Sequence, residues 1–85
     1  MRLDKFLKVS RIIKRRTVAK EVCDTGRVLV NGKVAKAGTA LKVSDIIEIG
    51  YARGSIKAEV TDLKEHVTKD GARELYKIIS GSEIE

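Results

Sequence analysis

Positively charged side chains gather between Arg11 and Val22, in the stretch RIIKRRTVAKEV, and the chemistry they suit is the binding of an anion. Lys14, Arg15 and Arg16 are consecutive and stand directly before a segment with helical periodicity. The first N–H groups of a helix lack intrahelical partners and attract phosphate, and an arginine fork can bind phosphate with two hydrogen bonds. Cations at this end oppose the helix dipole, so their clustering favours an anionic ligand over a merely solvated run of charge.

The distribution of charge along the chain points the same way. Residues 1–42 hold 12 Lys and Arg against 3 acidic residues, a net charge of +9, whereas residues 43–85 hold 6 against 9, a net charge of −3. A basic half joined to a mildly acidic half predicts one face for a polyanion and another that faces solvent. We therefore expect nucleic-acid binding, and the alternative is a basic surface that only serves solubility.

Other kinds of chemistry find no support in the residue pattern. A single cysteine forms no internal disulfide, and with a single histidine it does not make a zinc site. Cys23 falls on an apolar stripe, which indicates a buried structural thiol, and His66 stands in a polar stretch typical of a surface. We find no nucleophile–base pair, no carboxylate pair and no metal-ligand spacing. The expected protein is not an enzyme and uses no metal and no cofactor.

Hydrophobic periodicity predicts the helices that must position these cations. Leu3, Phe6 and Leu7 recur at helical spacing and predict a first helix over residues 3–9. Thr17 is the expected N-cap of a second helix, and Gly26 is the expected left-handed residue after its C-terminal end. The apolar stripe of this second helix consists of Val18, Ala19, Val22 and Cys23.

The middle of the chain predicts a small sheet. Asn31-Gly32 between valine-rich runs is a strong hairpin signal, because both turn positions tolerate positive φ. Residues 45–49 and 56–60 read as a third and a fourth strand, with a turn at Arg53-Gly54-Ser55 between them. Residues 36–44 are expected to be irregular.

The C-terminal part returns to helical spacing. Ala72, Leu75, Tyr76 and Ile79 predict a helix that ends at Gly81. With 85 residues the chain is one compact α+β unit, whose small core is built from aliphatic side chains. The first residues lack the apolar region of a signal peptide, and no run approaches the length of a membrane span, so we expect a cytoplasmic protein that is monomeric when free.

The segments RLDKFL, RIIKRRTVAKEV, GRVLVNGKVAK and VSDIIEI, in this order, resemble the S-four-type (alpha-L) RNA-binding domain. The resemblance covers residues 1–62, and residues 63–85 are then a helical extension. It implies two short helices packed on a small, mostly antiparallel curved sheet. One departure is Ser44-Asp45, where the family usually has Gly-Asp, and a small local adjustment is expected there.

Among members that stand alone, the chain resembles the heat-shock-protein-fifteen group and especially its short relatives called RqcP. That resemblance implies binding of rRNA and of stalled peptidyl-tRNA on the large ribosomal subunit, in ribosome-associated quality control. It also implies a partner of the RqcH type that directs alanine tailing of the stalled chain. The positions carried over as RNA contacts are Arg2, Lys5, Arg11, Lys14, Arg15, Arg16 and Lys20, followed by Arg27, Asn31 and Lys33.

Three other interpretations remain open at this point. The chain could be a more general structured-RNA-binding or ribosome-assembly factor. It could be a helix-turn-helix DNA-binding protein, although its short second helix carries mostly Lys and Glu on its polar face, which suits base readout poorly. It could also be a subunit that lends RNA binding to a catalytic partner.

Overall fold

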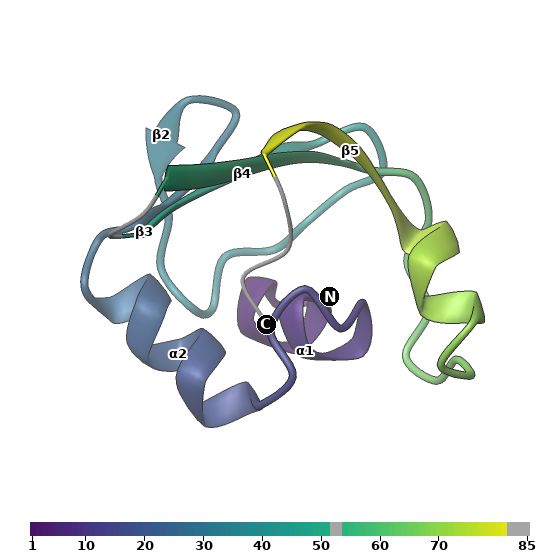
Figure 1. The fold of residues 1–85 in the computed structure, drawn as a ribbon. Helices are drawn as coiled ribbons and strands as arrows, with labels where there is room; N and C mark the ends of the chain where they lie inside the picture. Colours follow the sequence, from purple (N-terminus) through teal and green to yellow (C-terminus); the bar gives the residue numbers. More distant parts are fainter. Residues whose placement is uncertain (52–53, 82–85) are drawn as a thin grey trace.

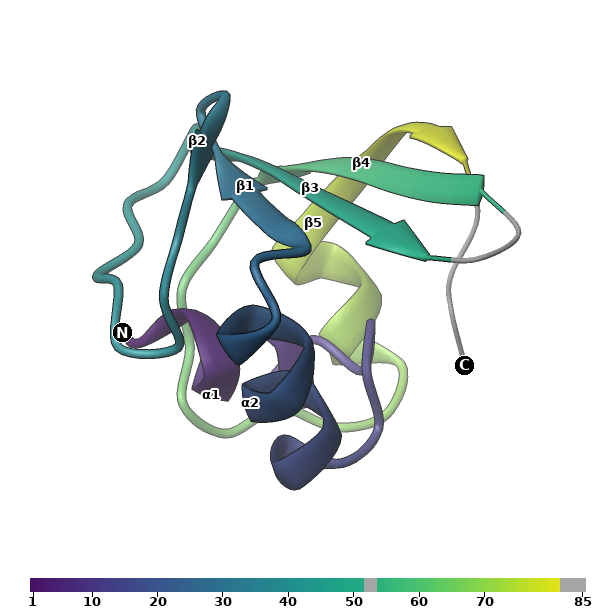
Figure 2. The ribbon, with the colours of Figure 1, turned by 90° about the vertical axis from the view of Figure 1, so that its left-hand side faces the viewer.

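The computed structural model describes residues 1–51 and 54–81, which form a five-stranded antiparallel sheet with short helices on one face. The order of the strands is β2-β1-β3-β4-β5. Both views of the ribbon place α1, α2 and the C-terminal 3-10 helix η1 on the same side of this sheet (Figures 1 and 2). The elements are α1 (Leu3–Val9), α2 (Arg16–Asp24), β1 (Val28–Val30), β2 (Lys33–Val34), β3 (Ile46–Tyr51), β4 (Gly54–Val60), η1 (Gly71–Leu75) and β5 (Tyr76–Gly81).

The core lies between the helices and the inner face of the sheet. Helix α1 contributes Leu3, Phe6 and Leu7, which are all fully buried, as the helical spacing predicted. Strand β4 alternates along its length, so that its apolar side chains face the helices. On the outer face Glu48 and Lys57 lie opposite each other, and their side chains approach to 3.7 Å. The helices and charged residues of the first half are therefore held by a conventional aliphatic core.

The second helix is confirmed, but the predicted N-cap is wrong. Helix α2 begins at Arg16, and its N-cap is Arg15, whose side chain makes no capping hydrogen bond. Thr17 lies inside the first turn, because the extended residue that precedes the helix is Arg15. Gly26 has φ of +77° just beyond the C-cap Thr25, as expected for a left-handed helix end.

The Asn31-Gly32 hairpin is confirmed. The two residues have φ of +52° and +82°, as a type I′ turn requires, and β1 pairs with β2 on either side of them. The Asn31 amide also joins the turn to the third strand. Its Nδ2 donates to Asp45 Oδ1 at 3.0 Å, and its Oδ1 accepts from the Ile46 N–H at 2.9 Å.

The predicted C-terminal helix is wrong. Within residues 63–81, which the structure describes, only Gly71–Leu75 are helical, as a 3-10 helix, and Tyr76–Gly81 form strand β5 along the edge of β4. Ala72 and Leu75 are buried as the pattern predicted, whereas Ile79 is 48% exposed. The β-branched pair Ile78-Ile79 favours a strand, and the free edge of β4 supplies the hydrogen-bonding partner that a short isolated helix would lack.

The third and fourth strands are confirmed near their predicted bounds, and each extends further than predicted, β3 to Tyr51 and β4 back to Gly54. The predicted turn at Arg53-Gly54-Ser55 lies partly outside the described residues, since Arg53 is not among them. Ser44 has φ of +80°, the left-handed region that glycine adopts most easily, at the position where the resembled family usually has glycine. In the described part of the chain, no helix is long and apolar enough to cross a bilayer.

Candidate nucleic-acid interface

A buried carboxylate organises the start of the basic surface. Asp4, in the first turn of α1, is only 2% exposed, and its Oδ1 accepts a hydrogen bond from Arg2 Nε at 3.1 Å. Its Oδ2 lies 3.4 Å from Arg16 Nε on the neighbouring helix, and the Lys5 N–H donates to Oδ1 at 2.8 Å. One carboxylate thus fixes two guanidinium groups from different segments, while the two arginine side chains remain 54% and 49% exposed.

The electrostatics of this triad favour its charged form. Burial alone would raise the pKa of Asp4, but the Arg2 hydrogen bond, the Lys5 N–H and the Arg16 charge together outweigh burial and lower the pKa. Asp4 therefore stays ionised at neutral pH and neutralises part of the two guanidinium charges. Arg16→Glu would place a second carboxylate beside this buried one, so that substitution perturbs folding as well as the surface charge.

Four more predicted contacts follow the exposed side of the connection and of α2. Lys14 and Arg15 lie directly before the helix, and Lys20 is on its exposed face, one turn after Arg16. Arg11 is exposed and has φ of +63°, uncommon for a residue other than glycine. Ile12 and Ile13 are buried and anchor this sharp bend to the core.

Lys5 differs from the other predicted contacts. It is half-buried, and its Nζ donates to Glu65 Oε1 across the chain. The Lys5 hydrogen bond and charge hold the pKa of Glu65 below its ordinary value. Lys5 therefore links α1 to the segment before η1, and an RNA phosphate would have to compete with Glu65 for its ammonium group.

The hairpin residues lie at the other end of α2. The helix is 9 residues and about 13 Å long, and Arg27 lies beyond its C-terminal end, away from the basic cluster at its start. Arg27 Nε donates to Thr25 Oγ1 at 2.9 Å, and Lys33 is exposed in β2. The Asn31 amide is already bonded to Asp45 and Ile46, which gives Asn31 a structural role in the turn.

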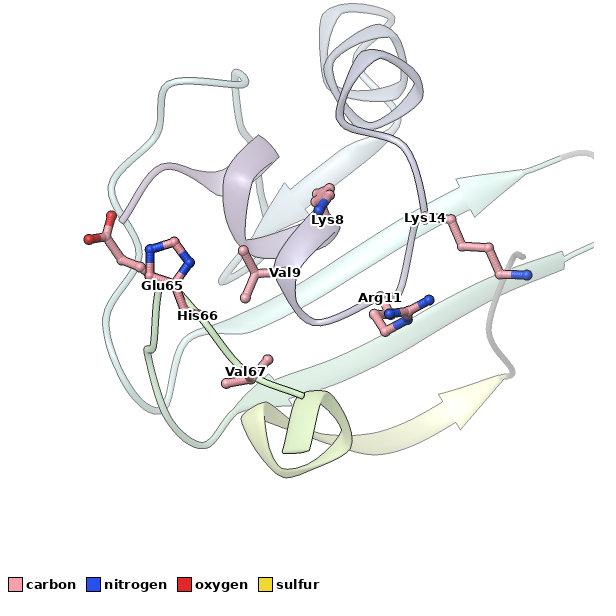
Figure 3. Close-up of a pocket in the computed structure, with 7 residues that line it drawn as sticks. All are labelled: Lys8, Val9, Arg11, Lys14, Glu65, His66 and Val67. Carbon is pink, nitrogen blue, oxygen red and sulfur yellow. The ribbon is translucent and has the colours of Figure 1, made fainter. Parts of the chain in front are cut away.

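The fold also gathers basic residues that the predicted set omits. Arg11 and Lys14 line one cleft of about 220 Å³ together with Lys8, Glu65 and His66. Figure 3 shows the Arg11 and Lys14 side chains pointing in one direction, away from Glu65 and His66. The same two residues line a second cleft of about 260 Å³, and its other basic residues are Lys69 and Arg73. The only sequence signal for this second pair is its spacing of four residues.

Cys23 behaves as predicted from its place on the apolar stripe. It is fully buried, and burial, with smaller effects from Asp4 and Asp24, raises the pKa of its thiol to about 11. A protonated, inaccessible thiol is a packing group. Within residues 1–51 and 54–81 no group of three or more His, Cys, Asp or Glu side chains is arranged to hold a metal ion.

Comparison with known proteins places this geometry in a family. A model of the S4 domain matches residues 1–47. A protein of Halalkalibacterium halodurans named RQC P-site tRNA stabilizing factor is 56% identical over 92% of this chain and 89% of its own length. Proteins with the same name in Streptococcus pneumoniae and Bacillus subtilis are 53% and 44% identical, over 100% and 99% of this chain and 97% and 98% of their own lengths.

Solved structures show the same fold. Heat Shock Protein 15 of Vibrio cholerae, determined as a trimer, superposes with a TM-score of 0.85 at 23% identity, over 94% of this chain and 82% of that one. A hypothetical protein determined in solution superposes with a TM-score of 0.80 at 28% identity, over 96% of this chain and all of the other. Both confirm the predicted α+β arrangement of two helices on an antiparallel sheet.

Proposed function

The chain belongs to the S4 domain family, among the proteins named RQC P-site tRNA stabilizing factor, and from that premise we propose that it is a non-catalytic RNA-binding protein of ribosome-associated quality control. Its ligands in this proposal are rRNA and the P-site tRNA of a large ribosomal subunit that carries a stalled nascent chain. It acts in the cytoplasm and is a monomer when free.

One observation carries the proposal: the buried Asp4 carboxylate presents two half-exposed arginines, Arg2 and Arg16, beside the basic start of α2. An arginine held at one edge by a carboxylate loses little side-chain entropy when its remaining N–H groups bind a phosphate. Structured RNA is recognised largely through its backbone and shape, and the low aromatic content of 4% leaves few side chains for base stacking.

We assign RNA contact to the exposed cations around this triad and along α2. The principal contacts are Arg2, Arg11, Lys14, Arg15, Arg16 and Lys20. Arg27 and Lys33 extend the surface at the hairpin, and Lys5 joins it only if the contact with Glu65 opens. Asn31 supports the hairpin through its side chain, so its contribution to RNA binding in this proposal is indirect.

The finer part of the proposal concerns the partner. Relatives carry a name that refers to stabilising P-site tRNA. We propose that this chain holds the peptidyl-tRNA while an RqcH-type factor directs alanine tailing. Its own side chains supply binding and orientation, and the addition of alanine belongs to the partner complex.

Gradient sedimentation tests this function directly. Arg15→Glu and Lys20→Glu change exposed residues that make no contact with Asp4, so stability should change by no more than about 0.5 kcal/mol. We expect wild type to co-sediment with the large subunit and with tRNA, and each variant to move toward the free fraction. In cells that carry either variant, alanine tails on stalled chains should decrease.

The matched control is Lys77→Glu, which makes the same change of charge on the outer face of the sheet, beside Glu59. It should sediment with the large subunit as wild type does. Normal melting together with normal ribosome association of both α2 variants would contradict the proposed surface. Higher affinity for duplex DNA than for structured RNA at one salt concentration would favour a DNA-binding protein instead.

A further inference from the structure

We propose that the cleft between the α1–α2 connection and η1 is a second binding site for RNA phosphates, which uses Lys69 and Arg73 from the C-terminal part of the chain. This inference deepens the proposed function and rests on it. The cleft measures about 260 Å³, and the residues that line it are Ser10, Arg11, Lys14, Lys69, Ala72, Arg73 and Tyr76.

Its charge is the first argument. Among the described residues that line the cleft, four are cationic and none is acidic, although Lys69 and Arg73 come from the half of the sequence whose net charge is −3. Within residues 1–51 and 54–81, Arg11, Lys69 and Arg73 take part in no ion pair. Like charges gathered around one hollow repel one another, and an anion in the hollow relieves that repulsion.

The local backbone explains why the two C-terminal cations act together. The Ala72 N–H donates to the Thr68 carbonyl at 2.9 Å, and the Gly71 N–H donates to Thr68 Oγ1 at 3.1 Å. These bonds fold the segment from Thr68 to Ala72 into one tight turn, and Lys69 and Arg73 both line the cleft from this turn and the start of η1. Ala72 on the same turn is buried, which fixes η1 against the rest of the molecule.

The α1–α2 connection, which forms the other wall of the cleft, is also held by the core. Arg11 is held at φ of +63° because its neighbours Ile12 and Ile13 are buried in the core. A strained backbone of this kind persists only where the surroundings enforce it, and such residues cluster at binding sites. Ser10 and Ala72, which also line the cleft, are each 1% exposed and so belong to the packed interior.

The nature of the lining selects the ligand. The walls are long cationic side chains, and the buried residues beneath them offer little apolar surface, whereas sites for small molecules are lined mainly by apolar and aromatic side chains. Arg11 and Lys14 also line the adjoining cleft of about 220 Å³, so the two hollows share one basic wall. A ligand with repeated phosphates fits this arrangement, and RNA that contacts Lys14 and α2 would reach Arg73 by continuing along the wall.

The test compares two neutralising pairs with the same change in net charge. Lys69→Gln with Arg73→Gln removes two charges from the cleft, and Lys57→Gln with Lys77→Gln removes two from the outer face of the sheet. Affinities for a defined structured RNA and for purified large subunits are measured from about 0.05 to 0.3 M salt, the range in which phosphate binding is most sensitive to ions. We expect the cleft pair to weaken binding about tenfold and to reduce the log–log salt slope by about one for each phosphate that is no longer bound. The outer pair should lie close to wild type.

Two further measurements separate the possible outcomes. Thermal melts of both pairs check that the chain remains folded, and a photocrosslinking residue placed at position 69 should attach to RNA where one at position 77 does not. Equal affinities and slopes for the two pairs, with RNA binding still abolished in Arg15→Glu, would overturn the cleft and leave the proposed function intact. Absence of RNA binding by wild type would overturn both. Crosslinking of position 69 to protein alone would assign the cleft to an acidic protein partner and also overturn the proposal.

Discussion

The fold changes the acidity of the Asp4 carboxyl through its buried contacts. In an unfolded chain its carboxyl titrates near 3.8, whereas in the fold its contacts with Arg2, Lys5 and Arg16 lower the pKa. The unfolded chain therefore takes up this proton first as the pH falls. The stabilisation is fully present above the ordinary carboxyl range and is lost as the pH falls through the lower pKa of the folded chain. Because Asp4 is buried, water does not replace these partners. Losing the contacts at low pH therefore lowers the free energy of unfolding of the protein.

We predict that Asp4→Asn lowers the free energy of unfolding at pH 7 by about 1–3 kcal/mol, because a neutral amide leaves both guanidinium groups without their counter-charge. Urea unfolding at pH 7 and pH 3 measures the free energy of unfolding of the variant and of wild type. The variant should lose less stability between the two pH values than wild type does. Some loss remains, because the backbone N–H of Lys42 and the amide of Asn31 also outweigh burial and lower the pKa of Asp45. Identical acid sensitivity of variant and wild type would contradict the role of Asp4.

At the scale of elements, the β1–β2 hairpin depends on backbone geometry at one position. Gly32 has φ of +82°, and a Cβ added there would meet no atom within 4 Å. A Cβ at this position is thus free of clashes, and the main cost of valine is the strain of a β-branched residue in the left-handed region, about 1–2 kcal/mol. We predict this loss for Gly32→Val in urea unfolding.

Gly32→Asn is the matched variant, since asparagine tolerates the left-handed region and should retain most of the stability. A loss that is equally large in both variants would mean that side-chain volume matters at the turn. No loss in either would mean that the hairpin rearranges at no cost. Because Asn31 also ties the turn to β3, a distorted hairpin should also displace Lys33 and weaken RNA binding slightly.

At the scale of the whole molecule, the basic surface determines how RNA binding depends on salt. Residues 1–42 carry a net charge of +9, and the fold adds Lys69 and Arg73 to the same region through the cleft they share with Arg11. If about five phosphates are engaged, affinity for structured RNA should fall with salt at a log–log slope of about −3 to −5. Titrations at several salt concentrations measure this slope. A nearly flat response, or strong preference for one short single-stranded sequence, would contradict an electrostatic, backbone-based interface.

The elements with strong local signals could be predicted from the sequence. The spacing of Leu3, Phe6 and Leu7 determines which face of α1 is buried, and Asn31-Gly32 determines a two-residue turn, because each signal acts between near neighbours in the chain. The clustering of cations before α2 is likewise a local signal. The apolar stripe that places Cys23 in the core is local too. These features were sufficient to predict the fold class and the basic surface.

The remaining features depend on residues that are distant in the sequence. Tyr76–Gly81 form a strand because β4 offers a free edge, and local periodicity contains no information about that edge. Asp4 becomes a buried anchor only because α2 brings Arg16 to it. Lys69 and Arg73 lie in the acidic half of the chain, yet they line one cleft together with Arg11 and Lys14. Charge and hydrogen bonding act over ångströms in space, so only the tertiary structure could decide which side chains share a site.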